Sequence, residues 1–129
     1  MTYLFDTDVM VDFFKHKAYA TALIEKLSQN ATLALSTITI AELRSGWTKK
    51  EAAFHLPRLY ALCVVVPVSK EIAEQAGAWR QEYTGKRLGT PDTLIAATAY
   101  LTHAPLFTNN TKHYPMKELA LHNGPAGAF

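Results

Sequence analysis

The sequence predicts one α/β domain of three layers, with a mostly parallel sheet between helices. Two patterns predict it. Short apolar runs of four or five residues, typical of strands buried on both faces, alternate with segments of helical period. Strands that alternate with helices are joined by right-handed crossovers, which makes the sheet parallel. The length of 129 residues fits a single domain.

Four apolar runs are the expected strands, and the two middle runs are rich in β-branched or aliphatic residues. They are Thr2–Phe5, Thr32–Leu35, Val64–Val68 and Pro105–Thr108. Three segments between them are expected to be helical: Ala18–Gln29, Ser69–Tyr83 and Thr93–Leu101. The first two carry apolar side chains on one face, and the third is apolar nearly all round, which predicts a core helix.

Composition excludes several classes of protein. The single cysteine, Cys63, excludes a disulfide framework and multi-cysteine zinc motifs, and its apolar neighbours favour a buried side chain. A formal net charge of +2 permits a polyanionic partner but does not argue for one. The start of the chain does not resemble a secretory signal, and no apolar run suits a bilayer span. We therefore expect a cytoplasmic protein with no membrane association.

Acidic residues fall where the predicted strands pass into helices. Asp6 closes the first strand, Glu42 follows the second, and Asp92 opens the core helix. Each also has a purely structural interpretation. Asp6 can cap the next helix, Thr39 with Glu42 fits a capping box, and an acid such as Asp92 is favoured in any first helical turn.

The carboxyl ends of parallel strands meet at one edge of a sheet, where open α/β sheets bind their ligands. Three carboxylates gathered there repel one another unless a cation lies among them. Since their ligand atoms are hard oxygens, the expected cation is Mg²⁺ or Mn²⁺. Such an ion can activate water for attack on phosphorus, so the residues predict a metal-dependent phosphoryl hydrolase.

Four motifs in this order resemble those of PIN-domain ribonucleases, most of all the VapC-type toxins of bacterial toxin–antitoxin pairs. They are Tyr3–Asp8, Ser36–Gly46, Asp92–Ala99 and Leu106–Tyr114. The resemblance runs from about Thr2 to Pro115. It therefore predicts a PIN-like domain over residues 1–115 and a C-terminal tail over residues 116–129.

The resemblance implies a sheet of four or five parallel strands, a homodimer, and endonucleolytic cleavage of an RNA such as tRNA or rRNA. It also implies a protein antitoxin as partner and Mg²⁺ or Mn²⁺ as cofactor. Asp6, Glu42 and Asp92 match the family's catalytic and metal-binding acids. Thr108 and Asn110 match accessory positions. Relatives usually carry a further acid near Asn110 or at the position of His113, and this chain has none there, which puts a second metal ion in doubt.

Other residues have both a functional and a structural interpretation. Asp8 and His113 are possible accessory residues of the site, while Asp8 and Asp12, one helical turn apart, also fit a solvated helix face. Trp47 and Tyr60 could stack on RNA bases or pack in the core or a dimer. Several basic residues could bind RNA backbone or simply lie on the surface: Arg44, Lys49, Lys50, Arg58, Lys86 and Arg87.

Two alternatives remain open at this point. Asp6 and Asp8 also fit the opening motif of haloacid-dehalogenase-like phosphatases, although the late acidic pair of those enzymes is missing, since only Glu118 follows Asp92. The chain could also be an impaired PIN domain that binds RNA or antitoxin without cleaving. We expect Asp6→Asn or Asp92→Asn to abolish cleavage and leave the fold intact, and Asn110→Asp to tighten metal binding.

Overall fold

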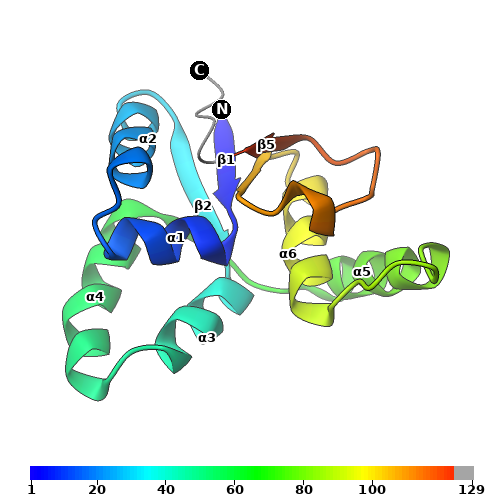
Figure 1. Ribbon diagram of the computed structural model, residues 1–129, viewed down its shortest axis with the longest axis horizontal. Helices are drawn as coiled ribbons and strands as arrows, with labels where there is room; N and C mark the ends of the chain where they lie inside the picture. Colours follow the sequence, from blue (N-terminus) through cyan, green and yellow to red (C-terminus); the bar gives the residue numbers. More distant parts are fainter. Residues whose placement is uncertain (124–129) are drawn as a thin grey trace.

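A five-stranded parallel sheet forms the centre of the computed structural model, which describes residues 1–123 (Figure 1). The spatial order of the strands is β3-β2-β1-β4-β5, and each neighbouring pair is parallel. Their bounds are β1 Thr2–Phe5, β2 Thr32–Ser36, β3 Val64–Val66, β4 Leu106–Thr108 and β5 Leu121–Asn123. The predicted α/β class and the four expected strands are confirmed, with small differences at their ends.

Helices cover both faces of the sheet, as the three-layer prediction requires. Figure 1 shows α1, α2 and α4 on one side and α5 and α6 on the other, with α3 beyond the carboxyl ends of the strands. The helices are α1 Thr7–Phe14, α2 Ala18–Ser28, α3 Thr37–Ser45, α4 Lys49–Leu62, α5 Lys70–Glu82 and α6 Thr90–Leu101, with a 3₁₀ turn at Thr111–His113. None of these helices is long and apolar enough to cross a membrane.

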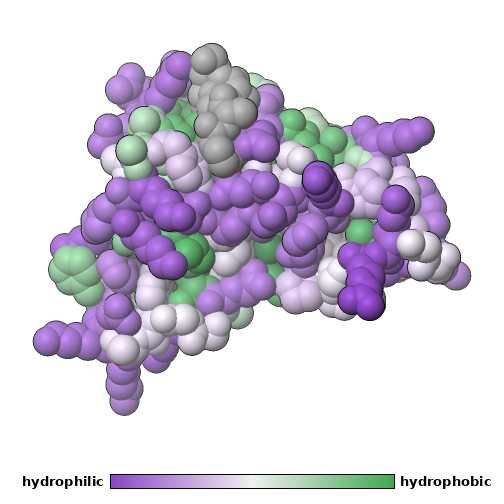
Figure 2. Space-filling view, in the orientation of Figure 1, coloured by the Kyte–Doolittle hydropathy of each residue, from purple (hydrophilic) through white to green (hydrophobic). Residues whose placement is uncertain are grey.

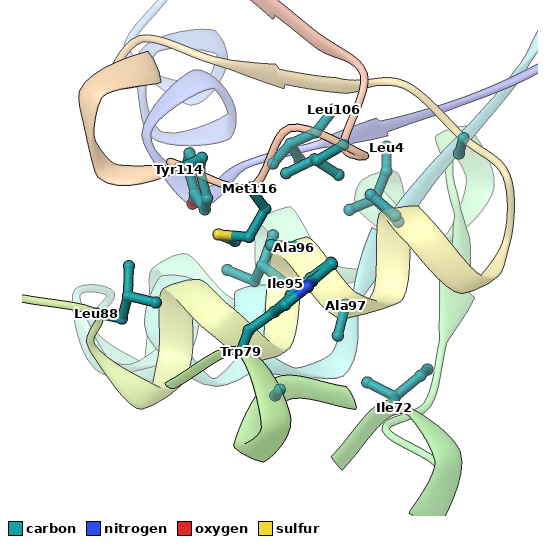
Figure 3. Close-up of a cluster of buried hydrophobic side chains, with 14 of the residues drawn as sticks. Leu4, Ile72, Trp79, Leu88, Ile95, Ala96, Ala97, Leu106, Tyr114 and Met116 are labelled. Carbon is teal, nitrogen blue, oxygen red and sulfur yellow. The ribbon is translucent and has the colours of Figure 1, made fainter. Parts of the chain in front are cut away.

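Alternate residues of β1 enter two separate cores. Leu4 packs with Trp79 of α5 and Ile95 of α6 in the core shown in Figure 3. Phe5, fully buried, faces the opposite core and stacks on Phe107 of β4 with 5.5 Å between ring centroids. Burial of a side chain of this size stabilises the fold by about 1.5–3 kcal/mol. Because both faces of the sheet are covered, its strands are apolar at successive positions.

The expected tail is not separate from the domain over residues 116–123. Met116 and Leu119 are buried in the same core as Trp79, and β5 pairs with β4 through Leu106 and Leu121. Since β5 has only three residues, of sequence Leu-His-Asn, it carries too little apolar character to be recognised as a strand. Residues 124–129, the remainder of the expected tail, lie outside the described residues.

Helix starts differ slightly from the predicted ones. Ser36, not Thr39, caps α3, and its hydroxyl accepts a hydrogen bond from the backbone N–H of Ile38 at 3.0 Å. Gly89 is the N-cap of α6, so this helix begins at Thr90, three residues before the expected segment Thr93–Leu101. The capping box predicted at Thr39 and Glu42 is therefore wrong, and both side chains project from within α3, where they can make other contacts.

Candidate functional site

Asp6 lies at the end of β1 and is held from three directions. Its side chain, 5% exposed, accepts hydrogen bonds from the backbone N–H of Thr7 at 2.8 Å, the hydroxyl of Thr108 at 2.8 Å and the hydroxyl of Tyr114 at 2.6 Å. Asp6 is thus the N-cap of α1 as well as a candidate ligand, and the two interpretations hold together. Thr108 ends β4, so neighbouring strands bring these residues together.

Glu42 reaches the same edge from α3. Its Oε1 accepts a hydrogen bond from the Thr7 hydroxyl at 2.5 Å, and that hydroxyl is also 3.0 Å from the hydroxyl of Thr39. Thr39 is fully buried, whereas Glu42 is exposed. Thr7 therefore connects the α1 terminus, which carries Asp6, to the α3 residues that follow β2.

Asp92 comes from the first turn of α6, on the other side of Asp6. Its carboxyl group is 38% exposed, and its Oδ2 lies 3.5 Å from Nδ1 of His113. Burial raises the pKa of Asp92, the charge of Asp6 raises it further, and Glu42 adds to the same effect, while His113 opposes it. The charges of Asp6 and Glu42 thus both act on Asp92, and His113 lies beside it.

Asp8 is joined to the loop that follows β4. Its Oδ2 accepts hydrogen bonds from the backbone N–H of Asn109 at 3.1 Å and from Nδ2 of Asn110 at 2.8 Å. Burial raises the pKa of Asp8 to about 6, and the nearby charge of Asp6 contributes. The Oδ1 atom of Asp8 is buried without a hydrogen-bond partner, as is that of Asn109. Asp8 therefore belongs to the acidic neighbourhood and is not a solvated face residue.

Asp12 forms a separate polar cluster behind this loop. It accepts hydrogen bonds from the Tyr19 hydroxyl and from Nδ2 of Asn109, and it pairs with Lys17 at 3.2 Å. Burial raises the pKa of Asp12, but the hydrogen bonds from Tyr19 and Lys17 outweigh it, so the net pKa is lowered. The charge of Asp12 is thus balanced by Lys17, and the hydrogen bonds of Asp12 and Tyr19 anchor Asn109 to α1 and α2.

The chemistry of the site fits a hard divalent cation. Its side chains offer carboxylate oxygens, burial and then the charge of Asp6 raise the pKa values of Asp8 and Asp92, and Asp8 has a buried oxygen with no donor. Across residues 1–123, however, no three His, Cys, Asp or Glu side chains lie close enough to hold one ion together. Mg²⁺ commonly binds through one or two carboxylates and keeps several waters, so a closed cage is not required.

The predicted basic residues differ in position and partners. Arg44 donates from Nη1 to the backbone carbonyl of Trp47 at 3.0 Å, and the Arg58 guanidinium lies 3.6 Å from the centre of the Phe54 ring. Lys49 and Lys50 open α4, Lys86 and Arg87 lie between α5 and α6, and all four are exposed. Their role in binding RNA remains a prediction.

Cys63 is buried as expected, and burial raises the pKa of its thiol to about 12.

Sequence analysis missed four residues that shape the site: Thr7, Tyr19, Asn109 and Tyr114. Burial and the charge of Asp6 raise the pKa of Tyr114 well above its usual range, so its hydroxyl remains a donor to Asp6. None of the four is acidic, and Asn109 and Tyr114 are about 100 residues from their partners in α1 and β1. The Asn109-Asn110 pair at the end of a predicted strand was the one available signal.

Comparison with known proteins gives a consistent result. Residues 3–119 match the model of the PIN domain family. The chain is 33% identical to ribonuclease VapC19 of Mycobacterium tuberculosis over 116 residues, which cover 88% of this chain and 92% of that protein. It is 33% identical to ribonuclease VapC10 of the same organism over 117 residues, covering 89% and 87%.

Solved structures agree with these relatives. A crystal structure of VapBC2 from Rickettsia felis, bound to a DNA fragment from its promoter, contains a chain with a TM-score of 0.83 and 32% identity, and the match covers 95% of this chain and 98% of that one. A toxin–antitoxin complex from Klebsiella pneumoniae gives a TM-score of 0.79 at 30% identity, covering 95% and 97%.

Proposed function

Because the chain belongs to the PIN-domain family, among its VapC ribonucleases, we propose that it is a metal-dependent endoribonuclease and the toxin of a toxin–antitoxin pair. One observation supports the assignment: Asp6 after β1, Glu42 in α3 and Asp92 in the first turn of α6 are near enough that the charges of Asp6 and Glu42 both raise the pKa of Asp92. Family membership disfavours the phosphatase alternative, in which Asp6 would act as a nucleophile.

The acids are proposed to hold Mg²⁺ or Mn²⁺, with Asp6 and Asp92 as the principal ligands and Glu42 and Asp8 beside them. When bound, such an ion would lower the pKa of water for attack on the phosphodiester and stabilise charge on phosphate oxygens. The protein's own part is orientation. The hydroxyl groups of Thr108 and Tyr114 both donate to Oδ2 of Asp6 and so fix the orientation of its carboxylate.

His113 has the geometry of an accessory residue. Its Nδ1 is 3.5 Å from Asp92, and its ring is 57% exposed, so the rest of the ring is open to a substrate phosphate. Asn110 is proposed to act in place of the missing acid by holding Asp8 through its amide group. This arrangement leaves one fewer negative charge at the site, which favours a single tightly bound ion.

Incubation with total RNA, with Mg²⁺ or with EDTA, tests the function when the cut ends are mapped. Cleavage that requires Mg²⁺ or Mn²⁺ and yields 5′-phosphate and 3′-hydroxyl ends supports the proposal. The Asp92→Asn variant is the matched control, since it removes one charge and keeps the shape of the side chain. RNA binding without cleavage in the wild-type protein would instead support the impaired PIN domain.

The partners follow from the same proposal. The solved relatives are toxin–antitoxin complexes, which supports a protein antitoxin as partner of this chain. We propose that the protein acts on a cytoplasmic RNA such as tRNA or rRNA and that it forms a homodimer. Light scattering on the purified chain tests the dimer, which would have twice the mass of 14.3 kDa.

A further inference from the structure

A cavity of about 330 Å³ opens beside Glu42 and is unlike the acidic site in chemistry. Three aromatic rings define it: Phe14 at the end of α1, Trp47 between α3 and α4, and His55 on α4. Lys15 and Glu42 lie on its wall as well. Figure 2 shows apolar surface between the hydrophilic band over α1 and the region of α3, in the part of the face where these helices approach one another.

The three rings contact one another, Phe14 and Trp47 also pack against the core that contains Phe5, and all three keep part of their surface accessible. Phe14 meets Trp47 nearly edge-on, at 5.1 Å between centroids and 84°, and His55 lies tilted on Trp47 at 4.8 Å and 39°. All three side chains are only partly buried. Rings fixed in this way present aromatic surface at little conformational cost, as stacking platforms for single-stranded nucleic acid do.

The cavity shares one residue, Glu42, with the candidate catalytic site. Glu42 forms part of its wall and also accepts the hydrogen bond from Thr7, the residue that follows Asp6. Helix α1 carries Asp6 at its start and Phe14 at its end, about 12 Å apart along the helix axis. RNA whose cleaved phosphate lies at Asp6 must therefore extend along α1 for a neighbouring base to reach the aromatic rings.

Resting on the proposed ribonuclease function, we propose that this cavity binds a nucleobase of the RNA next to the cleaved phosphodiester, with Trp47 as the main stacking surface. Lys15, an exposed cation on the same wall at the C-terminal end of α1, would meet the next phosphate of the RNA, on the far side of the base from Asp6. Stacking accepts any base, because every base has a π-face, so the subsite adds affinity and position and little sequence preference.

The test compares Trp47→Leu, which keeps apolar volume without an aromatic ring, with Trp47→Phe, which keeps a ring. Stacking on one residue corresponds to roughly a 5- to 100-fold change in affinity. We expect Trp47→Leu to raise KM for single-stranded RNA in that range with a smaller change in kcat, and Trp47→Phe to restore most of it. Tyr100→Leu is the control, since Tyr100 is a 37% exposed aromatic residue of α6 outside this cavity.

Tryptophan fluorescence gives a second readout that needs no catalysis. The chain has two tryptophans, and Trp79 is 2% exposed in the core, so ligand quenching reports on Trp47. In EDTA, a short single-stranded oligoribonucleotide should quench the fluorescence of the wild type more strongly than that of Trp47→Phe. Ribose 5-phosphate, which lacks a base, should not quench the fluorescence of either protein.

The outcomes separate this inference from the proposed function. Absence of metal-dependent RNA cleavage by the wild type contradicts the ribonuclease function itself. Normal cleavage with an unchanged KM in Trp47→Leu, together with no quenching by the oligoribonucleotide, overturns the base subsite alone. That second result would assign the aromatic cavity to packing or to a protein partner.

Discussion

Replacing Asp6 by Asn tests whether its carboxylate holds the fold together as well as the proposed metal. Relief of charge repulsion alone predicts an intact fold. The structure predicts a loss, because the 5% exposed carboxylate accepts three hydrogen bonds, two of them on Oδ2 from Thr108 and Tyr114. Asn keeps one acceptor oxygen, so either the backbone N–H of Thr7 or the two hydroxyl groups would face an NH₂ group.

The magnitude follows from these contacts. A hydrogen bond to a charged acceptor contributes about 1.5–3 kcal/mol, and part of this is returned by removing repulsion with Asp8 and Asp92. We expect Asp6→Asn to lower the free energy of unfolding by about 1–3 kcal/mol, which lowers Tm by roughly 4–12 °C in a domain of this size. Asp92→Asn, whose side chain is 38% exposed, should change it by less than about 0.5 kcal/mol or stabilise the fold.

Urea denaturation of the metal-free proteins measures both effects, and a double-mutant cycle with Tyr114→Phe isolates the central contact. The coupling free energy between Asp6 and Tyr114 should be about 1–2 kcal/mol, since their oxygens are 2.6 Å apart and both side chains are buried. Asp6→Asn and Asp92→Asn should each lose RNA cleavage. Wild-type stability of Asp6→Asn, or strictly additive effects in the cycle, would refute the reasoning.

Three further predictions concern the loop after β4 and its contacts with α1. In Asn110→Asp, the new carboxylate would face that of Asp8, so the free energy of unfolding of the metal-free variant should fall by about 1 kcal/mol. Added Mg²⁺ should then raise the Tm of the variant by more than it raises the Tm of the wild type. Unchanged Mg²⁺ affinity by calorimetry would contradict this prediction. Asn109→Ala removes hydrogen bonds to Asp12 and Tyr19 and should cost about 1–2 kcal/mol in urea, whereas equal stability would show that the loop is not anchored there. Because the pKa of Asp8 is raised from 3.8 to about 6, its ionisation destabilises the fold as pH rises through that range. The Asp8→Asn variant should therefore be about 1 kcal/mol more stable than the wild type at pH 7, after a discount for solvent screening, and no more stable below pH 4. A difference in Tm that does not depend on pH would count against this prediction.

Much of the fold was predictable because its signals are local. Apolar runs buried on both faces of a sheet, such as Leu4 with Phe5, are visible within a few residues of sequence. Strand β5 was not, because it is three residues long and is defined only by its pairing with β4. The caps of α3 and α6 were misplaced by one to three residues, since Ser, Thr and Gly near a helix start all satisfy the same preference.

The site, like the fold, was predictable only in part. The positions of Asp6 after β1 and of Glu42 in the helix after β2 could be read from the sequence, and the parallel topology brings the ends of these two strands to one edge. Asp92 opens α6, which follows α5 and not a strand, so its place depends on how α6 packs. The roles of Tyr114 and Asn109 could not, because each depends on hydrogen bonds to residues about 100 positions away. Neutral hydroxyl and amide groups carry no sequence signal that marks such a role.

The sequence by itself determined the class of the fold, the order of its elements and the supply of acidic side chains, because burial periodicity and charge are properties of neighbouring residues. Only the tertiary structure decided which donors orient Asp6, which loop holds Asp8, and that Phe14 of α1 packs against Trp47. Those arrangements depend on distances between segments far apart in the chain, and such distances exist only once both cores have packed against the sheet.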